Sequence, residues 1–291
     1  GPEGIGKSTL SMISCGQVCK AGGKVLWASV EDFDWDWAHQ CGIPPDTRNF
    51  GLAESVAGND LLDAVVDAVF QGEWDLIVID SIAALQNLEY GFDSGSYKKG
   101  VGEMDRGGQA RMLNNFVNRF YQGTKYITRQ LHEGANVRMP AVVAINQLRT
   151  QGIGTGYTKM DSGGGWGLKH GKSIDIMLKK SENIYLGDKN DPKFVAQRVY
   201  YEITKNKTGV PRRVGTFILG TASIDPYIKG KIDRVEEVIQ LAKRSGIIER
   251  TGSWYMIAGQ KFHGEQALIE SLRGDEEFLV KLGEEALSIY R

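Results

Sequence analysis

The chain opens with Gly1-Pro2-Glu3-Gly4-Ile5-Gly6-Lys7-Ser8-Thr9, a glycine-rich stretch from which the rest of the architecture can be argued. It fits the pattern Gly-x4-Gly-Lys-Ser, whose glycines let backbone N–H groups turn inward around a phosphate ahead of a helix N-terminus. In that pattern the Lys7 ammonium contacts the β- and γ-phosphates and the Ser8 hydroxyl binds Mg²⁺. We therefore predict a phosphate-binding loop followed by a helix; the alternative is a glycine-rich helix start that fits by chance.

Apolar strands and amphipathic helices alternate after this loop. Continuous apolar runs are typical of parallel strands covered on both faces. The 3.6-residue period of helices recurs between them, with Asn59 or Asp60 as one N-cap and a further helix over about 105–121. This alternation predicts an α/β fold with a mostly parallel, twisted sheet flanked by helices. The expected strands lie at 25–29, 75–80, 141–146, 174–178, 199–204 and 214–219.

The pattern changes near Ser223, where a second, smaller unit is expected to begin. A helix is predicted over 233–244, with Gly246 at the position that follows a helix C-cap. Trp254 and Tyr255 are expected on a short strand, and Asp275 caps a last helix with apolar residues at core spacing. We therefore divide the chain into a core domain, residues 1–222, and a small α/β C-terminal domain, residues 223–291.

Composition excludes a disordered or membrane-spanning chain. Hydrophobic residues make up 41% and charged residues 24% of 291, which is typical of a globular protein. No uncharged apolar run approaches the roughly 18 residues of a membrane span, so we expect a cytoplasmic protein with no membrane partner. The three cysteines, Cys15, Cys19 and Cys41, are too few for a disulfide framework and are expected to be buried thiols rather than a metal site.

The middle of the chain is basic although the net charge is −1. Residues 138–213 contain 14 Lys and Arg against 6 Asp and Glu, a net of +8, and the remainder carries −9. Two glycine-rich, patternless segments, 87–104 and 150–172, each follow an apolar strand, at the edge where open α/β sheets bind ligands. The composition of the second segment, with Arg149 just before it and Lys159, Lys169 and Lys172 among its glycines, suits a mobile basic loop that follows a nucleic-acid backbone; the alternative is a basic linker or solvated loop.

Two carboxylates follow predicted strands at the same edge of the sheet. Asp80 ends the second apolar strand, where a carboxylate would hold Mg²⁺ through water, the alternative being a simple cap. Glu31 stands just past the first strand and could orient and deprotonate a water that attacks the γ-phosphate. The alternative for Glu31 is a surface acid in an acidic stretch.

Two further polar features end predicted strands. Lys205 and Lys207 lie two residues apart, so both ammoniums share one face of a strand, where an anion would offset their repulsion. On residues alone, an edge-strand pair that prevents aggregation is the favoured interpretation. Gln147 follows the third strand and begins the second glycine-rich segment, where it could sense a γ-phosphate and order that segment.

These motifs, in this order, resemble the bacterial RecA recombinase family. The resemblance covers nearly the whole chain. It rests on GPEGIGKST, LIVIDSIAAL, GEMDRGGQARM, AINQLR, SGGGWGLK, KNK and GSWY. It implies a RecA-type ATPase core that binds ATP and Mg²⁺ and forms helical filaments of many copies on single-stranded DNA. Such filaments pair that strand with homologous double-stranded DNA.

The resemblance also assigns roles to individual residues. Glu31 becomes the catalytic glutamate, Asp80 the Mg²⁺-holding acid and Gln147 the γ-phosphate sensor. Lys7 joins them in catalysis, and the phosphate loop comprises Gly1, Pro2, Glu3, Gly4, Ile5, Gly6, Lys7, Ser8 and Thr9. Asp34 and Trp37 hold the adenine, and Lys205 and Lys207 reach the ATP of a neighbouring copy. DNA contacts are implied for a first loop at 92–105 and for Arg111, Arg149, Ile153, Lys159, Gly163, Gly164 and Lys169.

Two finer expectations accompany the resemblance. The segment Ile224-Asp225-Pro226-Tyr227 and the glycine triplet at 163–165 also look like the phage UvsX-type branch. Because the sequence starts at the phosphate loop, we expect truncation at the N-terminus, with the family's oligomerisation segment and first strand missing. Two other functions stay open: a different motor of this fold, such as a ring helicase or clock-type ATPase, and a non-hydrolysing DNA-binding remnant.

Overall fold

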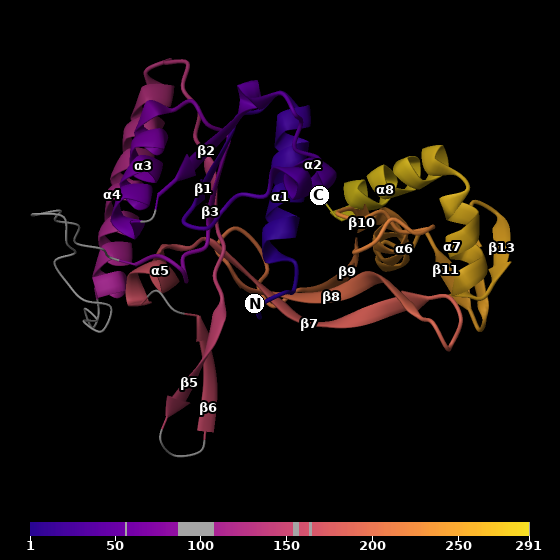
Figure 1. Ribbon diagram of the computed structural model, residues 1–291. Coiled ribbons are helices and arrows are strands. Elements are labelled where there is room, and N and C mark those ends of the chain that lie inside the picture. Colours follow the sequence, from indigo (N-terminus) through magenta and orange to yellow (C-terminus); the bar gives the residue numbers. More distant parts are fainter. Residues whose placement is uncertain (56, 87–107, 154–156, 163–164, 291) are drawn as a thin grey trace, which may run out of the picture. The chain divides into compact units, whose positions relative to one another are not determined.

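The computed structural model describes residues 1–55, 57–86, 108–153, 157–162 and 165–290 (Figure 1). Two compact units account for them. The first comprises Gly1–Lys180 and Glu202–Arg213, and the second comprises Ser181–Tyr201 and Val214–Arg291. Each unit is therefore assembled from two stretches of the chain.

The first unit is built on a four-stranded parallel sheet. Its strands are β1 (Val25–Ser29), β2 (Phe50–Glu54), β3 (Leu76–Asp80) and β4 (Ala141–Ala144), in the order β2-β1-β3-β4. All three pairings are parallel, and Ser29 at the end of β1 is the register partner of both Glu54 and Asp80. The carboxyl ends of these strands therefore meet at one edge, as expected from the sequence.

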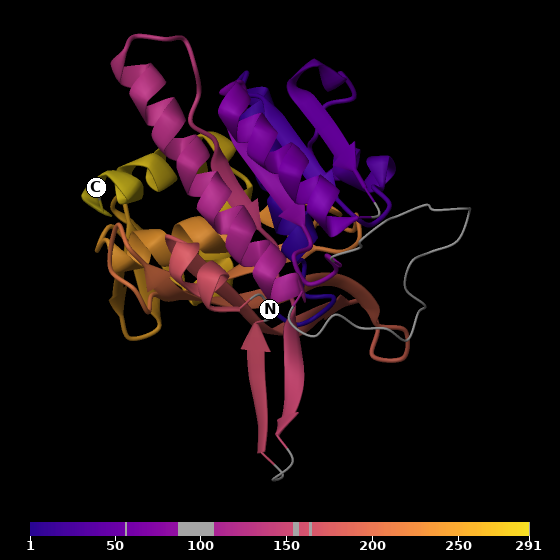
Figure 2. The ribbon, with the colours of Figure 1, turned by 90° about the vertical axis from the view of Figure 1, so that its left-hand side faces the viewer.

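Helices cover both faces of this sheet (Figures 1 and 2). One face packs against α3 (Gly58–Gln71) and α4 (Gly108–His132) through a cluster that includes Leu61, Val65 and Leu113. The other packs against α1 (Lys7–Lys20) and α2 (Trp35–Cys41) through a cluster that includes Cys15 and Trp27. A short 3-10 turn, η1 (Thr47–Asn49), precedes β2. The α/β class predicted from the alternating pattern is confirmed.

The start of α3 differs from the prediction. The N-cap is Ala57 rather than Asn59 or Asp60, and no side chain caps the helix. Gly58 N donates to Gln86 O at 3.0 Å, and a Cβ on Gly58 would lie 2.8 Å from that oxygen. Because a tertiary backbone contact fixes this helix start, the capping residues nearby did not mark it.

The segment 150–172 is more regular than its composition suggests. Strands β5 (Leu148–Ile153) and β6 (Tyr157–Ser162) pair as an antiparallel hairpin, from Leu148 opposite Ser162 to Ile153 opposite Tyr157. The short helix α5 (Gly165–Gly171) follows and lies against α4. Backbone pairing needs no apolar alternation, so a patternless sequence concealed a hairpin. Helix α4 also extends eleven residues beyond its expected end at residue 121.

In the second unit the helix at 233–244, the strand at 254–255 and the last helix were predicted, whereas the strands at 249–251 and 260–263 and the helix at 265–273 were not. Asp275 caps the last helix through Phe278 N at 2.9 Å, and Gly246 has a φ of 78°, which confirms both predicted positions. The core includes Ile239, Leu268 and Ala286. Strands β7 (Ile174–Leu186) and β8 (Lys193–Asn206), which contribute to both units, form a sheet with β9 (Val214–Gly220) and β10 (Ile232–Asp233), in the order β10-β9-β8-β7. The remaining elements are α6 (Arg234–Arg244), β11 (Glu249–Thr251), β12 (Trp254–Ile257), β13 (Gln260–His263), α7 (Glu265–Arg273) and α8 (Glu276–Tyr290).

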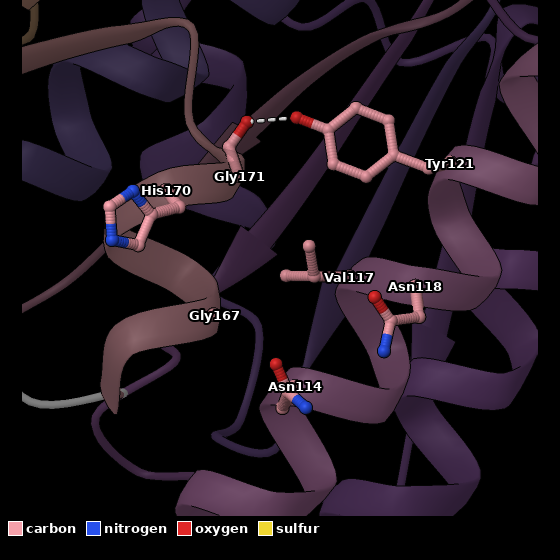
Figure 3. A pocket seen from close by; sticks show the side chains of 7 residues that line it. All are labelled: Asn114, Val117, Asn118, Tyr121, Gly167, His170 and Gly171. Atoms are coloured by element: carbon pink, nitrogen blue, oxygen red, sulfur yellow. Dashed lines mark hydrogen bonds between the residues drawn. The ribbon is translucent and has the colours of Figure 1, made fainter.

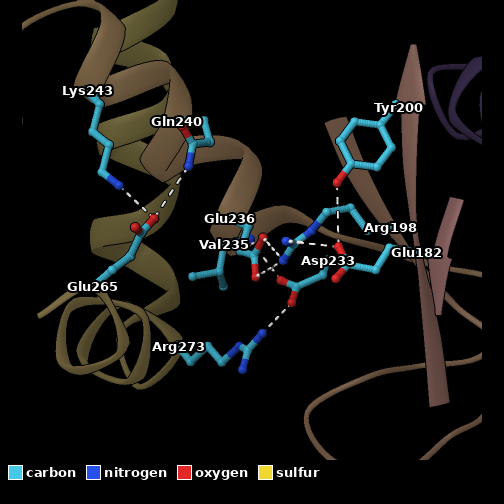
Figure 4. Close-up of polar contacts among 10 residues, drawn as sticks. All are labelled: Glu182, Arg198, Tyr200, Asp233, Val235, Glu236, Gln240, Lys243, Glu265 and Arg273. Carbon is cyan, nitrogen blue, oxygen red and sulfur yellow. Dashed lines mark hydrogen bonds and ion pairs between the residues drawn. The ribbon is translucent and has the colours of Figure 1, made fainter. Parts of the chain in front are cut away.

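A network of ion pairs joins β8, α6 and α7 in this unit (Figure 4). The Arg198 guanidinium donates to both carboxylate oxygens of Glu236, at 2.9 and 3.2 Å. Arg273 pairs with Asp233, whose other oxygen caps α6, and Lys243 pairs with Glu265 at 2.6 Å. The two charged α6 side chains in this network, Glu236 and Lys243, therefore each have a partner of opposite sign.

The three cysteines are free and buried, as predicted, and burial raises the pKa of the Cys15 thiol to about 12. Within the described ranges, no group of three or more His, Cys, Asp or Glu side chains is arranged to hold a metal ion. Among these residues, no helix is both long and apolar enough to cross a membrane.

Candidate nucleotide-binding site

The glycine-rich loop turns into α1 through two left-handed residues. Gly4 has a φ of 68°, and Gly6, the N-cap of α1, has a φ of 86°, a conformation that favours glycine. The loop is attached to the segment between β4 and β5, because Gly1 O accepts from Leu148 N at 3.1 Å and Gly1 N donates to Asn146 O at 3.3 Å. Gln147, the expected phosphate sensor, therefore lies directly beside the first residue of the loop.

The Lys7 ammonium folds back over this loop and donates to the carbonyl of Pro2. Partial burial lowers the pKa of Lys7, while the nearby carboxylates of Asp80 and Glu3 oppose that shift. Among the described residues, the ammonium is thus bonded to a neutral carbonyl oxygen and to no carboxylate. A phosphate oxygen would be a stronger acceptor for the same charge.

Ser8 and Asp80 meet through their side chains at the carboxyl end of β3. Burial raises the pKa of the Asp80 carboxyl, the Glu31 charge adds to that rise, and a hydrogen bond from Ser8 and the charge of Lys7 oppose it. A buried carboxylate beside a hydroxyl supplies the oxygen ligands that Mg²⁺ prefers. These residues therefore fit a magnesium ion, which would relieve the electrostatic cost of burying Asp80.

The Ser29 hydroxyl bonds to the backbone of both Glu31 and Asp80. Ser29 was not assigned this role from the sequence. Its hydroxyl, 3% exposed, donates to Asp80 O at 2.9 Å and accepts from Glu31 N at 3.0 Å. The Glu31 side chain is exposed at this edge. The available signal was a polar residue at the end of an otherwise apolar strand, which is expensive to bury unless it is hydrogen-bonded.

Asp34 and Trp37, the expected adenine contacts, lie at the start of α2. Asp34 is its N-cap and accepts from Trp37 N at 2.9 Å. The Trp37 indole donates to the Thr9 hydroxyl at 3.3 Å, which brings the ring to the first turn of α1. The structure thus places an aromatic side chain and a carboxylate next to the phosphate loop.

Lys205 and Lys207 both bind the C-terminal end of α5. Lys205 Nζ donates to Lys169 O at 2.8 Å and to His170 O at 3.4 Å, and Lys207 Nζ donates to His170 O at 3.1 Å. Desolvation lowers the pKa of Lys205, and the charges of Lys207 and Lys172 lower it further. The two ammoniums therefore lie on one side of β8, as their spacing predicted, and cap the helix near the end of the second glycine-rich segment.

The expected DNA contacts fall partly within the described residues. Arg111 is exposed in the first turn of α4, and Lys169 is exposed on α5. Arg149, Ile153 and Lys159 belong to the β5–β6 hairpin. Gly163, Gly164 and the whole of 92–105 lie outside the described residues.

Helices α4 and α5 enclose a shallow groove (Figure 3). The Tyr121 hydroxyl closes one end by donating to Gly171 O. Glycines allow the close approach of the helices, since a Cβ on Gly167 would lie 2.3 Å from Asn114 Oδ1. The groove is lined by Asn114, Val117, Asn118, Tyr121, Gly167, His170 and Gly171.

A parallel sheet with helices on both faces, and a glycine loop beside the Ser8–Asp80 pair, define an α/β protein of the phosphate-loop class. The family model for the RecA N-terminal domain matches residues 1–222, and the chain belongs to the RecA family.

Relatives with similar sequences bear this out. The chain is 29% identical over 280 residues to Protein RecA of Mycoplasma mycoides subsp. mycoides SC, covering 95% of this chain and 72% of that protein. It is 27% identical to Protein RecA of Chloroherpeton thalassium, covering 97% and 71%. It is 28% identical to the DNA repair protein recA homolog 3, mitochondrial, of Arabidopsis thaliana, covering 97% and 60%.

Proposed function

We propose that this chain is an ATP-dependent DNA recombinase. It assembles a helical filament on single-stranded DNA, pairs that strand with homologous double-stranded DNA and exchanges strands in recombination and repair. Membership of the RecA family supports this function. The observation that carries it is the convergence of Lys7, Ser8, Asp80 and Glu31 at the carboxyl end of β1 and β3, because those are the groups that hydrolysis of a nucleoside triphosphate needs.

In this proposal the loop backbone and Lys7 bind the phosphates of ATP, and Ser8 and Asp80 hold Mg²⁺. The metal supplies charge neutralisation for the transferred phosphoryl group when it is bound. Glu31 takes a proton from the attacking water, and its position is set by the Ser29 hydroxyl. Asp34 and Trp37 hold the adenine.

Coupling between ATP and DNA would pass through two connections seen in the chain. Gln147 lies beside Gly1 and immediately precedes Leu148, the first residue of the β5–β6 hairpin, so the terminal phosphate and the hairpin would share one short segment. We further propose that Lys205 and Lys207 exchange their α5 carbonyl partners for the ATP of a neighbouring copy. In this proposal residues 1–222 form the ATPase core and residues 223–291 form a smaller domain. The proposed origin in the phage UvsX-type branch rests on residues 224–227 and the glycine triplet alone.

The test is ATP hydrolysis measured with and without single-stranded DNA. We expect DNA to stimulate hydrolysis, and an ATP analogue to tighten binding to a fluorescent oligonucleotide. Equal hydrolysis with and without DNA, or equal oligonucleotide affinity with and without the analogue, would contradict the proposal. In micrographs, open helical filaments support it and closed rings favour a ring motor. DNA binding without any nucleotide binding would identify a non-hydrolysing module.

A further inference from the structure

One hydroxyl near the phosphate loop lacks a hydrogen-bond partner. Within the described part of the chain, the buried polar side chains are Thr9, Ser11, Ser29 and Ser81, with 9%, 9%, 3% and 1% exposed. Thr9 accepts from Trp37, Ser11 donates to Lys7 O, and Ser29 has the two bonds described above. The Ser81 hydroxyl, the most deeply buried of the four, bonds to none of the described residues.

The backbone around Ser81 is fixed on both sides. Its carbonyl accepts from Ala84 N at 3.0 Å, and Ile82 N donates to Ile145 O at 2.9 Å. On the preceding side, Asp80 O accepts from Ser29. The backbone of Ser81 is therefore held at the carboxyl edge of the sheet, between the end of β3 and the segment that leads to Gln147.

A buried hydroxyl without a partner costs free energy, and native proteins rarely leave one unsatisfied. Bulk water does not reach Ser81, because only 1% of the residue is exposed. Its neighbour Asp80 belongs to the cluster that would bind Mg²⁺ and phosphate. A bound anion in that cluster would supply the acceptor that this O–H group lacks in the free chain.

We propose that Ser81 donates a hydrogen bond to the terminal phosphoryl group of the bound nucleoside triphosphate and thereby distinguishes a triphosphate from a diphosphate. This inference rests on the proposed function. The loop backbone and Ser8 account for the β-phosphate and Mg²⁺, and Lys7 supplies charge to both the β- and γ-phosphates. Ser81 follows Asp80, and the next residue, Ile82, bonds to Ile145, two residues before Gln147. Ser81 is thus a specificity residue for the terminal phosphoryl group, which is released when the triphosphate is hydrolysed.

Ser81→Ala tests this proposal with Mg²⁺ and two probes, a non-hydrolysable ATP analogue and ADP. We expect affinity for the analogue to fall about tenfold, which corresponds to about 1.4 kcal/mol, and affinity for ADP to change less than about twofold. Without nucleotide, the melting temperature should rise by about 2 °C, because the substitution removes a buried group that has no partner.

Ser29→Ala is the matched control, since it removes an equally buried hydroxyl that is fully bonded. It should lower the melting temperature of the nucleotide-free chain. Equal loss of affinity for both nucleotides, unchanged affinity for the analogue, or a lower melting temperature in Ser81→Ala would each overturn the inference. A parent chain that binds neither nucleotide refutes the proposed function itself, an outcome that is recognised without any variant.

Discussion

The phosphate-loop cluster and the ion-pair network of the second unit bury similar chemical groups in opposite ways. Burial raises the pKa of both Asp80 and Glu236. Glu236 has a guanidinium held against both of its oxygens, while Asp80 has a serine hydroxyl, the nearby charge of Lys7 and the repulsion of Glu31. The network satisfies itself, whereas the loop cluster is left with charge and hydrogen-bonding capacity that only a ligand can use.

This contrast separates polar groups that stabilise the fold from those available for function. A carboxylate paired with arginine has its charge balanced within the fold, and removal of the arginine would leave a buried charge uncompensated. A carboxylate that is buried against another acid reduces stability in the free chain, and binding of a cation converts that cost into affinity. Substitutions in the two regions should therefore affect different measurements.

The largest effect is expected for Lys7→Ala. The loop would lose a half-buried ammonium, which among the described residues donates to the carbonyl of Pro2 in the free chain. ATP hydrolysis should fall to background, while the melting temperature of the nucleotide-free chain stays within about 2 °C of the parent. Lys20→Ala, at the far end of the same helix, is the control and should keep full activity. Residual DNA-stimulated hydrolysis in Lys7→Ala would remove the loop from the mechanism.

Glu31→Gln should reduce the rate of hydrolysis by about 10²–10⁴ and leave nucleotide binding intact, because a general base acts only in the chemical step. Asp32→Asn changes the adjacent exposed acid and should change the rate less than about twofold. Single-turnover hydrolysis measures the step directly. Equal rates in Glu31→Gln and the parent would show that Glu31 is merely a surface acid.

Arg198→Met tests the other half of the comparison. It leaves Glu236 half-buried without its cation, so the free energy of unfolding should fall by about 2 kcal/mol. Lys281→Met, which breaks an exposed pair with Glu277 on α8, should cost no more than about 0.5 kcal/mol. Urea unfolding measures both. If the free energy of unfolding falls equally in both variants, the ion-pair network contributes no more to stability than an exposed pair does.

Asp80→Asn should give the smallest change in the free energy of unfolding, and the change should be an increase rather than a decrease. Because burial raises the folded pKa of Asp80, the stability that this group provides is fully present below pH 3.8 and is lost as the pH rises through the raised value. At neutral pH the nucleotide-free variant should therefore be more stable than the parent, within about 1 kcal/mol. Urea unfolding at several pH values tests this; no gain above pH 4 would contradict it. Stabilisation by Mg²⁺ and nucleotide should meanwhile disappear.

The fold was largely predictable because its strongest signals are local. The runs at 25–28 and 76–79 are apolar without interruption, and they lie in β1 and β3, which are buried throughout except at Asp80. The last helix was recognisable from Asp275, whose capping bond joins residues three apart. Signals of this kind need no knowledge of the remaining chain.

Other features depend on partners far away in the sequence, and these could not be predicted. The start of α3 is set by a backbone bond to Gln86, 28 residues later. Ser29 gains its role from Asp80, 51 residues away, through strand register. Lys205 and Lys207 appeared on residues alone to be edge-strand lysines, yet they cap a helix about 36 residues earlier in the chain.

The sequence by itself determined the kinds of element, the phosphate loop and the family resemblance, because backbone preference, apolar period and motif spacing act over a few residues. Only the tertiary structure decided which polar groups are satisfied. Ser29 and Ser81 are both serines at the ends of apolar strands, and nothing local distinguishes them. The register of β1 and β3 gives Ser29 two partners, while the turn after β3 leaves the Ser81 hydroxyl none among the described residues, since hydrogen bonds depend on distances that the fold alone sets.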